Sequence, residues 1–371
     1  MDIMGFCEIV PDCRNDKNKV YSATELVFIT TVSVLCGSDT WNEIQFFCER
    51  NFDYFKKRLP DLRGVPSHDT LNAFFSVLDI REFEYSFRTW IDEICTRIPG
   101  VVAIDGKAVC RDPDGKNGVK SKLYMVSAWA ARNGICLGQE KVSEKSNEIT
   151  AIPELLTELA LEGCIVTIDS MGCQKKIAEM IVNAGADYVL AVKDNQKELK
   201  ESVDFWLNED NRLYLGQGRR YTTEETGHGR YEFRECVVVD NSDIARLSHK
   251  DWKGLRTMAK ITSTRRVGTQ EPTIETRYYI SSLEADPKLI MESVRTHWQV
   301  ENNLHWMLDV AFREDYTRKT DNAAINLSLI NKVILTMLRQ TKRKEGLASR
   351  RKFCGWDENF RDEVLGIKFI D

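Results

Sequence analysis

In this 371-residue chain, two acidic residues each follow a run of apolar residues of the kind usually buried. Asp105 ends the apolar part of VVAIDGKAV, residues 101–109, and Asp169 ends that of CIVTIDSMG, residues 164–172. A carboxylate beside buried apolar surface is costly unless it is paired or bound to a metal ion. The repeated arrangement therefore predicts a functional site to which both aspartates contribute.

A third acidic residue, Glu301, lies in a predicted helix of roughly 25 residues that begins near Asp286 and Pro287. At about 100° per residue, Glu301 falls in the middle of the apolar face of this helix. One interpretation is a salt bridge to a core arginine or lysine. The functional interpretation is that Glu301 points inward to a metal held with the two aspartates. Asp309, about 80° away on the same helix, is the second candidate for the third ligand.

The chemistry of three converging carboxylates is that of a hard, oxygen-rich metal site, which suits Mg²⁺ or Mn²⁺ rather than zinc. Two such ions about 4 Å apart hold the attacking and leaving oxygens of an in-line phosphoryl displacement. No G-x-x-x-x-G-K-[ST] loop is present, so ATP hydrolysis is disfavoured.

The elements that must position the aspartates are strands. Apolar runs and turn signals predict three strands, a helix, a strand, a helix and a strand, at residues 101–109, 122–131, 134–143, 148–163, 164–170, 173–186 and 188–193. This is the element order of an RNase H-like α/β fold, in which the first and fourth strands are neighbours. The order therefore predicts that Asp105 and Asp169 lie side by side.

The other segments predict a small all-helical N-terminal domain, a β-rich insertion and a basic C-terminal tail. The N-terminal domain spans residues 1–98; residues 21–95 carry apolar positions at helical spacing, and a Pro-Gly break follows. Short helices joined by tight turns suit a DNA-binding domain, although small helical bundles have many other uses. The catalytic domain then spans 99–371, with the insertion at about 200–285 and the tail at about 339–371.

Composition and charge leave the partner open. The net charge of −5 argues mildly against nucleic acid, but residues 253–266 and 339–352 are strongly basic. A solvated face explains such segments as well as a DNA contact does. The eleven cysteines are scattered without Cys-x-x-Cys spacing, and no secretory signal or membrane-spanning run is present. We therefore expect a cytoplasmic protein without disulfides and without a membrane partner.

A set of motifs in order along the chain resembles one known family. AIDGK, KSNEITAIPELL, TIDSMGCQ, YVLAVKDNQ, HGRYEFR and HWQVENNLHWMLDVAFREDYTR are similar to segments of the H-repeat-associated, ISAs-type DDE transposases of bacterial insertion sequences. The resemblance implies an RNase H-like catalytic domain, a DNA-binding N-terminal region, and Mg²⁺-dependent cleavage and transfer of DNA strands. It also implies a catalytic triad of Asp105, Asp169 and Glu301, a homo-oligomer such as a dimer on DNA, and a nucleoid-associated location.

Residues around the triad are candidate DNA contacts, namely Lys107, Lys193, Asn195, Gln196, His228, Arg230, His297 and His305. Lysine, asparagine and glutamine commonly contact phosphates. Each candidate has a plainer interpretation: a surface lysine, a helix cap, an exposed turn, or a histidine hydrogen-bonded within the core. Either histidine also has the alternative of orienting the Glu301 carboxylate.

Three functions agree with these patterns. The first is a transposase that cuts transposon terminal repeats and joins the ends to target DNA. The second is a DNA-binding protein derived from a transposase but without catalysis, which an intact triad argues against. The third is a nuclease that cuts without joining, because cleavage and joining can share one site.

Overall fold

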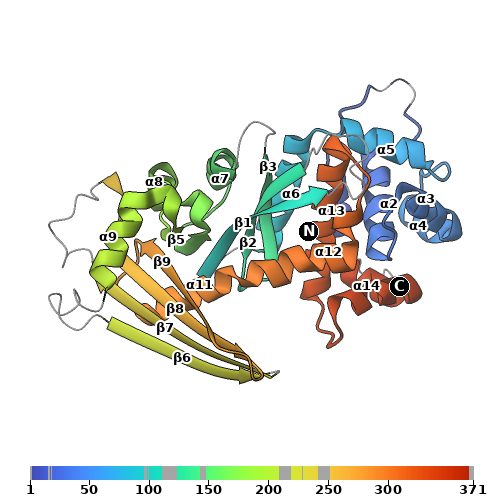
Figure 1. Cartoon of the computed structure of the whole chain (residues 1–371). Coiled ribbons are helices and arrows are strands. Elements are labelled where there is room, and N and C mark those ends of the chain that lie inside the picture. Colours follow the sequence, from blue (N-terminus) through green and yellow to red (C-terminus); the bar gives the residue numbers. More distant parts are fainter. Residues whose placement is uncertain are drawn as a thin grey trace, which may run out of the picture.

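The computed structural model describes residues 2–15, 17, 19–95, 98, 100–110, 123–142, 148–208, 219–227, 229–240 and 251–366. Its central feature is one nine-stranded sheet with the order β3-β2-β1-β4-β5-β9-β8-β7-β6, flanked by helices (Figure 1). The strands are β1 (Gly100–Cys110), β2 (Leu123–Ala130), β3 (Ile135–Val142), β4 (Cys164–Ile168), β5 (Asp187–Val192), β6 (Arg219–Gly227), β7 (Arg230–Asp240), β8 (Thr257–Val267) and β9 (Thr273–Ser281).

The first five strands have the predicted arrangement. Strands β1, β2 and β3 are antiparallel neighbours, and β4 pairs in parallel with both β1 and β5. The predicted pairing of the first and fourth strands is therefore confirmed. Its last register pair is Ile104 with Ile168, so both strands reach their aspartate at the same end of the ladder.

The predicted β-rich insertion is confirmed in its strands β6 to β9, whereas its first part is helical. Residues 200–207 belong to helix α9 (Lys197–Leu207), whose buried Leu199, Val203 and Leu207 recur at helical spacing. The later strands continue the main sheet, because β9 pairs antiparallel with β5 from Val189 to Val192. Strands β6 to β9 therefore extend the sheet that carries both aspartates.

The N-terminal helices share one apolar core with the C-terminal helices, and this core runs from Ile3 to Leu365. The N-terminal set is α1 (Ile3–Glu8), α2 (Ala23–Leu35), α3 (Trp41–Arg50), α4 (Phe52–Arg58), α5 (His68–Val77) and α6 (Ile80–Ile94). Helix α13 (Asp321–Gln340) packs against α2, α5, α6 and also β3. The N-terminal helices are thus joined to the sheet through a helix from the far end of the chain.

The basic C-terminal segment is folded rather than a solvated tail. It forms α14 (Leu347–Trp356) and α15 (Glu358–Leu365). Arg351 and Arg361 are buried, and their guanidinium groups donate to the backbone carbonyls of Val34 and Cys354, respectively. Part of the positive charge of this segment is therefore used within the protein.

The predicted long helix around Glu301 is broken. It consists of α11 (Pro287–His297), a π-helical turn (Glu301–His305) and α12 (Trp306–Phe312). The prediction that Glu301 lies on the apolar face is wrong, because its side chain is 65% exposed. A π-helical turn contains an additional residue, which offsets the helical wheel on its two sides. Among the described residues, no helix is both long and apolar enough to span a bilayer.

Candidate active site

Asp105 and Asp169 lie where the β1–β4 ladder ends. The Asp105 carboxylate accepts a hydrogen bond from the N–H of Gly106 at 2.9 Å. The Asp169 carboxylate accepts from the N–H of Met171 at 2.9 Å and caps the short 3₁₀ helix Ser170–Gly172. Both side chains are held by local backbone groups where the β1–β4 ladder ends.

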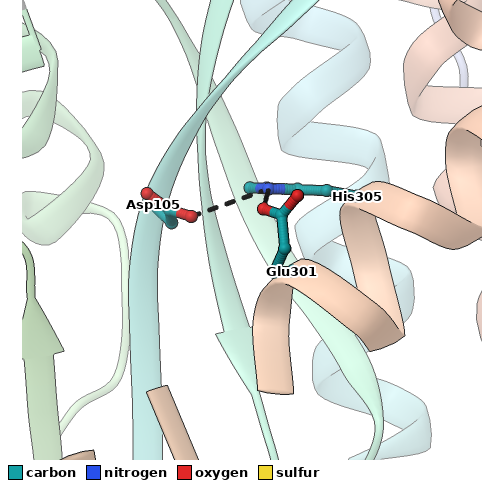
Figure 2. A group of neighbouring side chains, drawn as sticks. All are labelled: Asp105, Glu301 and His305. Atoms are coloured by element: carbon teal, nitrogen blue, oxygen red, sulfur yellow. Dashed lines mark hydrogen bonds and ion pairs between the residues drawn. The ribbon is translucent and has the colours of Figure 1, made fainter. Parts of the chain in front are cut away.

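Glu301 and His305 approach Asp105 from the π-helical turn, as Figure 2 shows. The Nδ1 atom of His305 lies 3.1 Å from the Glu301 Oε2 atom and 3.6 Å from the Asp105 Oδ2 atom. One ligand atom from each of the three residues lies within 4.8 Å of the other two. These donors can hold a metal ion, and the two carboxylates match the oxygen ligands that Mg²⁺ and Mn²⁺ prefer.

The electrostatics of the site favour a bound cation. Burial raises the pKa of Asp105 to about 7, the Gly106 N–H opposes this, and the charges of Asp169, Glu148 and Glu301 add to it. Burial lowers the pKa of His305 despite its bond to Glu301, so its imidazole adds little positive charge at neutral pH. The site therefore concentrates negative charge that a divalent cation would neutralise.

The three predicted catalytic residues line one cleft of about 560 Å³ between β4, β5, β9 and the start of the π-helical turn. Its wall also carries Lys193, Lys200, Arg277 and Trp298. The guanidinium of Arg277 lies over the Trp298 ring, 4.1 Å from the centroid, and this ring is 50% exposed. A cation and an exposed aromatic face beside carboxylates suit a polyanion that has bases to stack.

Lys107 was a candidate DNA contact, with a surface lysine as the alternative, but its surroundings favour a structural role. Its Nζ atom lies 2.6 Å from Asp309, 3.0 Å from Glu314 and 3.7 Å from Asp315. The Lys107 side chain is only 10% exposed. The same contact explains Asp309, the second candidate for the third ligand: its carboxylate pairs with Lys107, whereas Glu301 lies beside Asp105.

Asn195 and Gln196 follow β5 and were expected to contact DNA, but their amides bond to the protein. The Asn195 Nδ2 atom donates to the carbonyl of Ser170 at 2.7 Å, and Gln196 Nε2 donates to that of Cys173 at 3.0 Å. Both residues therefore hold the turn that follows Asp169, which favours positioning over phosphate contact. Lys193 is exposed at the cleft and retains a geometry that suits DNA.

The remaining candidate DNA contacts lie in different places. The His297 Nδ1 atom lies 3.1 Å from the Thr167 hydroxyl of β4, and burial lowers the pKa of this histidine. His305 is only 4% exposed, which favours its alternative role of orienting Glu301. Arg230 begins β7 at the β6–β7 turn and lies 3.7 Å from Glu232. His228 lies outside the described residues.

Glu148 is a carboxylate at the site that the sequence reasoning missed. It is the first residue of α7 (Glu148–Thr157), and its charge contributes to the raised pKa of Asp105. Burial and the Asp169 charge raise the pKa of Glu148 itself. The sequence signal was present, since Glu148 belongs to the KSNEITAIPELL motif, but an acidic residue in the first turn of a helix is ordinary.

Comparison with known proteins identifies the family to which this chain belongs. The family described as the transposase DDE domain matches residues 96–338, and the family described as DDE_Tnp_1-associated matches residues 5–91. The chain therefore belongs to the DDE transposase family.

Relatives extend this assignment over nearly the whole chain. The "Putative transposase YncI" of Escherichia coli O157:H7 is 36% identical over 98% of this chain and 94% of its own length. The "H repeat-associated putative transposase YhhI" of Escherichia coli K12 is 34% identical over 98% and 97%. A solved structure that resembles this one is the cryo-EM structure of a piggyBac transposase synaptic complex with hairpin DNA. The match covers 98% of this chain and 77% of the piggyBac chain, with a TM-score of 0.44 and 11% identity.

Proposed function

We propose that this protein is a metal-dependent DNA transposase that cleaves DNA at the terminal repeats of an insertion sequence and transfers the ends to target DNA. The observation that carries the proposal is the meeting of Asp105, Asp169 and Glu301, from β1, from the end of β4 and from the π-helical turn, around one cleft. The family assignment supports the same function. The strand order β3-β2-β1-β4-β5 supports an RNase H-like core for the catalytic part.

The residues that would hold Mg²⁺ or Mn²⁺ are Asp105, Asp169 and Glu301. When bound there, a pair of such ions would stabilise charge on the attacking and leaving oxygens of the phosphoryl transfer. His305 faces the Glu301 and Asp105 carboxylates and keeps them oriented. Asn195 fixes the turn after Asp169 through its bond to Ser170. These contacts place the carboxylates before substrate arrives.

The walls of the cleft suit a DNA strand. Lys193 and Lys200 provide positive charge near Asp169, and the exposed Trp298 ring provides a stacking surface. Transposition brings the two ends of one element to the same target, so we infer that the protein acts on DNA as a homo-oligomer, with a dimer as the simplest form. The N-terminal helices, matched by a family that accompanies this catalytic domain, are proposed to bind the ends.

The experiment is an incubation of purified protein with Mg²⁺ and labelled duplexes that carry the inverted repeats flanking its gene, with and without a target plasmid. The substitutions Asp105→Asn, Asp169→Asn and Glu301→Gln should each reduce cleavage by more than about 100-fold, since loss of an outer-sphere partner alone costs 10- to 100-fold. Binding of the same duplexes, measured by gel shift, should remain.

The results separate the alternatives. Cleavage followed by joining to the plasmid supports a transposase, and cleavage without joining supports a nuclease. Binding without any cleavage by the parent protein supports a DNA-binding protein that has lost catalysis. Equal cleavage by the parent and by the Glu301→Gln variant would overturn the assignment of the third carboxylate.

A further inference from the structure

A fourth carboxylate, that of Glu148, occupies space beside the catalytic strand that only glycine leaves open. A Cβ atom built on Gly106 would lie 2.2 Å from the Glu148 Oε1 atom and 2.5 Å from its Cδ atom. Gly106 is not among the glycines with positive φ. Its backbone conformation therefore suits other residues, so what glycine provides here is room for the Glu148 side chain.

Glu148 reaches this position from the face of the sheet opposite to Glu301. On β4, Thr167 contacts His297 of α11, whereas the next side chain, Ile168, lies near Gly172 and Ile152 of α7. Because successive side chains of a strand point to opposite faces, α7 and α11 cover opposite faces of the sheet. The carboxylates thus approach the strand ends from two sides.

The end of the β1–β4 ladder connects the two faces. The register pairs of these strands stop at Ile104 and Ile168, so the backbone of Gly106 has no β4 residue beside it. Its N–H instead donates to Asp105. Beyond the last pair, no ladder hydrogen bonds close the sheet between Asp105 and Asp169. A group held over Gly106 therefore lies next to the gap between the two aspartates.

The charge of Glu148 is not compensated within the described part of the chain, where no arginine or lysine forms an ion pair with it. The three other carboxylates of the site are likewise without a cationic partner there, apart from the contact of His305 with Asp105 and Glu301. A half-buried glutamate that no described arginine or lysine neutralises, beside two more carboxylates, is costly unless something positive binds. This cost is explained if the site holds a metal ion.

We propose that Glu148 is a fourth carboxylate of the catalytic centre, held across Gly106 to help bind a divalent cation between Asp105 and Asp169. This inference rests on the proposed function, because it assigns a further ligand to the same metal site. In this arrangement Asp105, Glu301 and His305 surround one side of the centre, and Asp105, Asp169 and Glu148 surround the other. Asp105 is the residue common to both sides.

The test is direct Mn²⁺ binding to the full chain without DNA, measured by the electron paramagnetic resonance signal of free Mn²⁺. The Glu148→Gln variant should bind at least one Mn²⁺ about 10- to 100-fold more weakly than the parent. The matched control is Glu154→Gln on the same helix, where the exposed side chain lies 3.8 Å from Arg81, and it should bind as the parent does. Metal-free melting curves check that each variant is folded.

A second variant tests the geometry. Gly106→Ala introduces a methyl group into the space of the Glu148 carboxylate, so it should weaken Mn²⁺ binding to a similar extent. In a Glu148→Ala background the carboxylate is gone, and Gly106→Ala should then add little further loss. If the losses of Mn²⁺ affinity in the two single variants add up in the double variant, Gly106 does not act through Glu148.

The outcomes distinguish this inference from the proposed function. If Asp105→Asn and Asp169→Asn lose Mn²⁺ but Glu148→Gln binds it as the parent does, the fourth ligand is wrong and the catalytic site stands. If the Asp105 and Asp169 variants also bind Mn²⁺ normally, the proposed metal centre itself is wrong. Weakened binding in all three, with Glu154→Gln unchanged, supports both.

Discussion

The catalytic cleft and the cluster around Lys107 both gather acidic side chains, yet their charge balance differs. The two regions meet on β1, where Asp105 and Lys107 are two positions apart. Asp105 faces Glu301 and a histidine, His305, whose pKa is lowered by burial. Lys107 points to the same face of β1 and lies within 4.0 Å of three carboxylates. Both regions gather acidic groups, but among the described residues only in the second does a lysine pair directly with them.

The pKa directions follow this difference. Burial raises the pKa of Asp105 to about 7, and neighbouring carboxylates reinforce the effect. Burial also acts on Glu314, but the charges of Lys107 and Lys332 more than offset it, so the pKa of Glu314 is lowered. Burial alone therefore does not mark a functional carboxylate. An acidic group whose charge the protein leaves uncompensated is the better indicator of a cation site.

The largest expected effect comes from removing the internal cation. Lys107→Met should lower the free energy of unfolding by about 3–5 kcal/mol, because it removes the cation 3.0 Å from the buried Glu314 carboxylate. Urea unfolding monitored by circular dichroism measures this change. Lys175→Met is the control, since its ion pair with Asp251 is exposed and should contribute at most about 1 kcal/mol. A loss of under 1 kcal/mol at Lys107 would contradict the charge-matched cluster.

A smaller effect, of opposite sign, is expected at the cleft in the absence of metal. The folded pKa of Asp105 lies above its unfolded value of about 4, so its contribution to stability is present below pH 4 and is lost as pH rises through about 7. Asp105→Asn removes this loss. With EDTA present, the free energy of unfolding of the variant, relative to that of the parent, should therefore rise by more than about 1 kcal/mol from pH 4.5 to pH 7.5. A constant difference across this range would contradict the raised pKa.

The smallest expected change concerns a positioning contact at the cleft. Asn195→Ala removes the hydrogen bond to the Ser170 carbonyl and should cost about 1 kcal/mol of stability. Cleavage of end DNA should become slower, while the affinity for that DNA, measured by gel shift, should stay the same. A several-fold loss of affinity with unchanged stability would instead return Asn195 to the role of a DNA contact.

The sequence alone was sufficient for the order of the first five strands and for the position of Asp105 and Asp169 where the β1–β4 ladder ends. Alternation and apolar runs depend on the local backbone, so they located the first five strands and, through the known order of such elements, the pairing of β1 with β4. The helix around Glu301 was only partly predictable, because a π-helical turn changes the side-chain directions without changing the residue pattern. The helical start of the insertion was missed although its apolar spacing was present.

Only the tertiary structure decided which charges meet. No local pattern shows that Lys107 faces Asp309, Glu314 and Asp315, because these residues are far from it in the sequence. Lys107 and Glu314, for example, are 207 residues apart. The same holds for Glu148, which reaches the site because Gly106 leaves space on the far face of the sheet. Periodicity reports the conformation of a segment, whereas charge compensation depends on contacts between distant segments. Residue types and spacing therefore predict that acidic groups converge, and the fold decides which of them remain available to bind a cation.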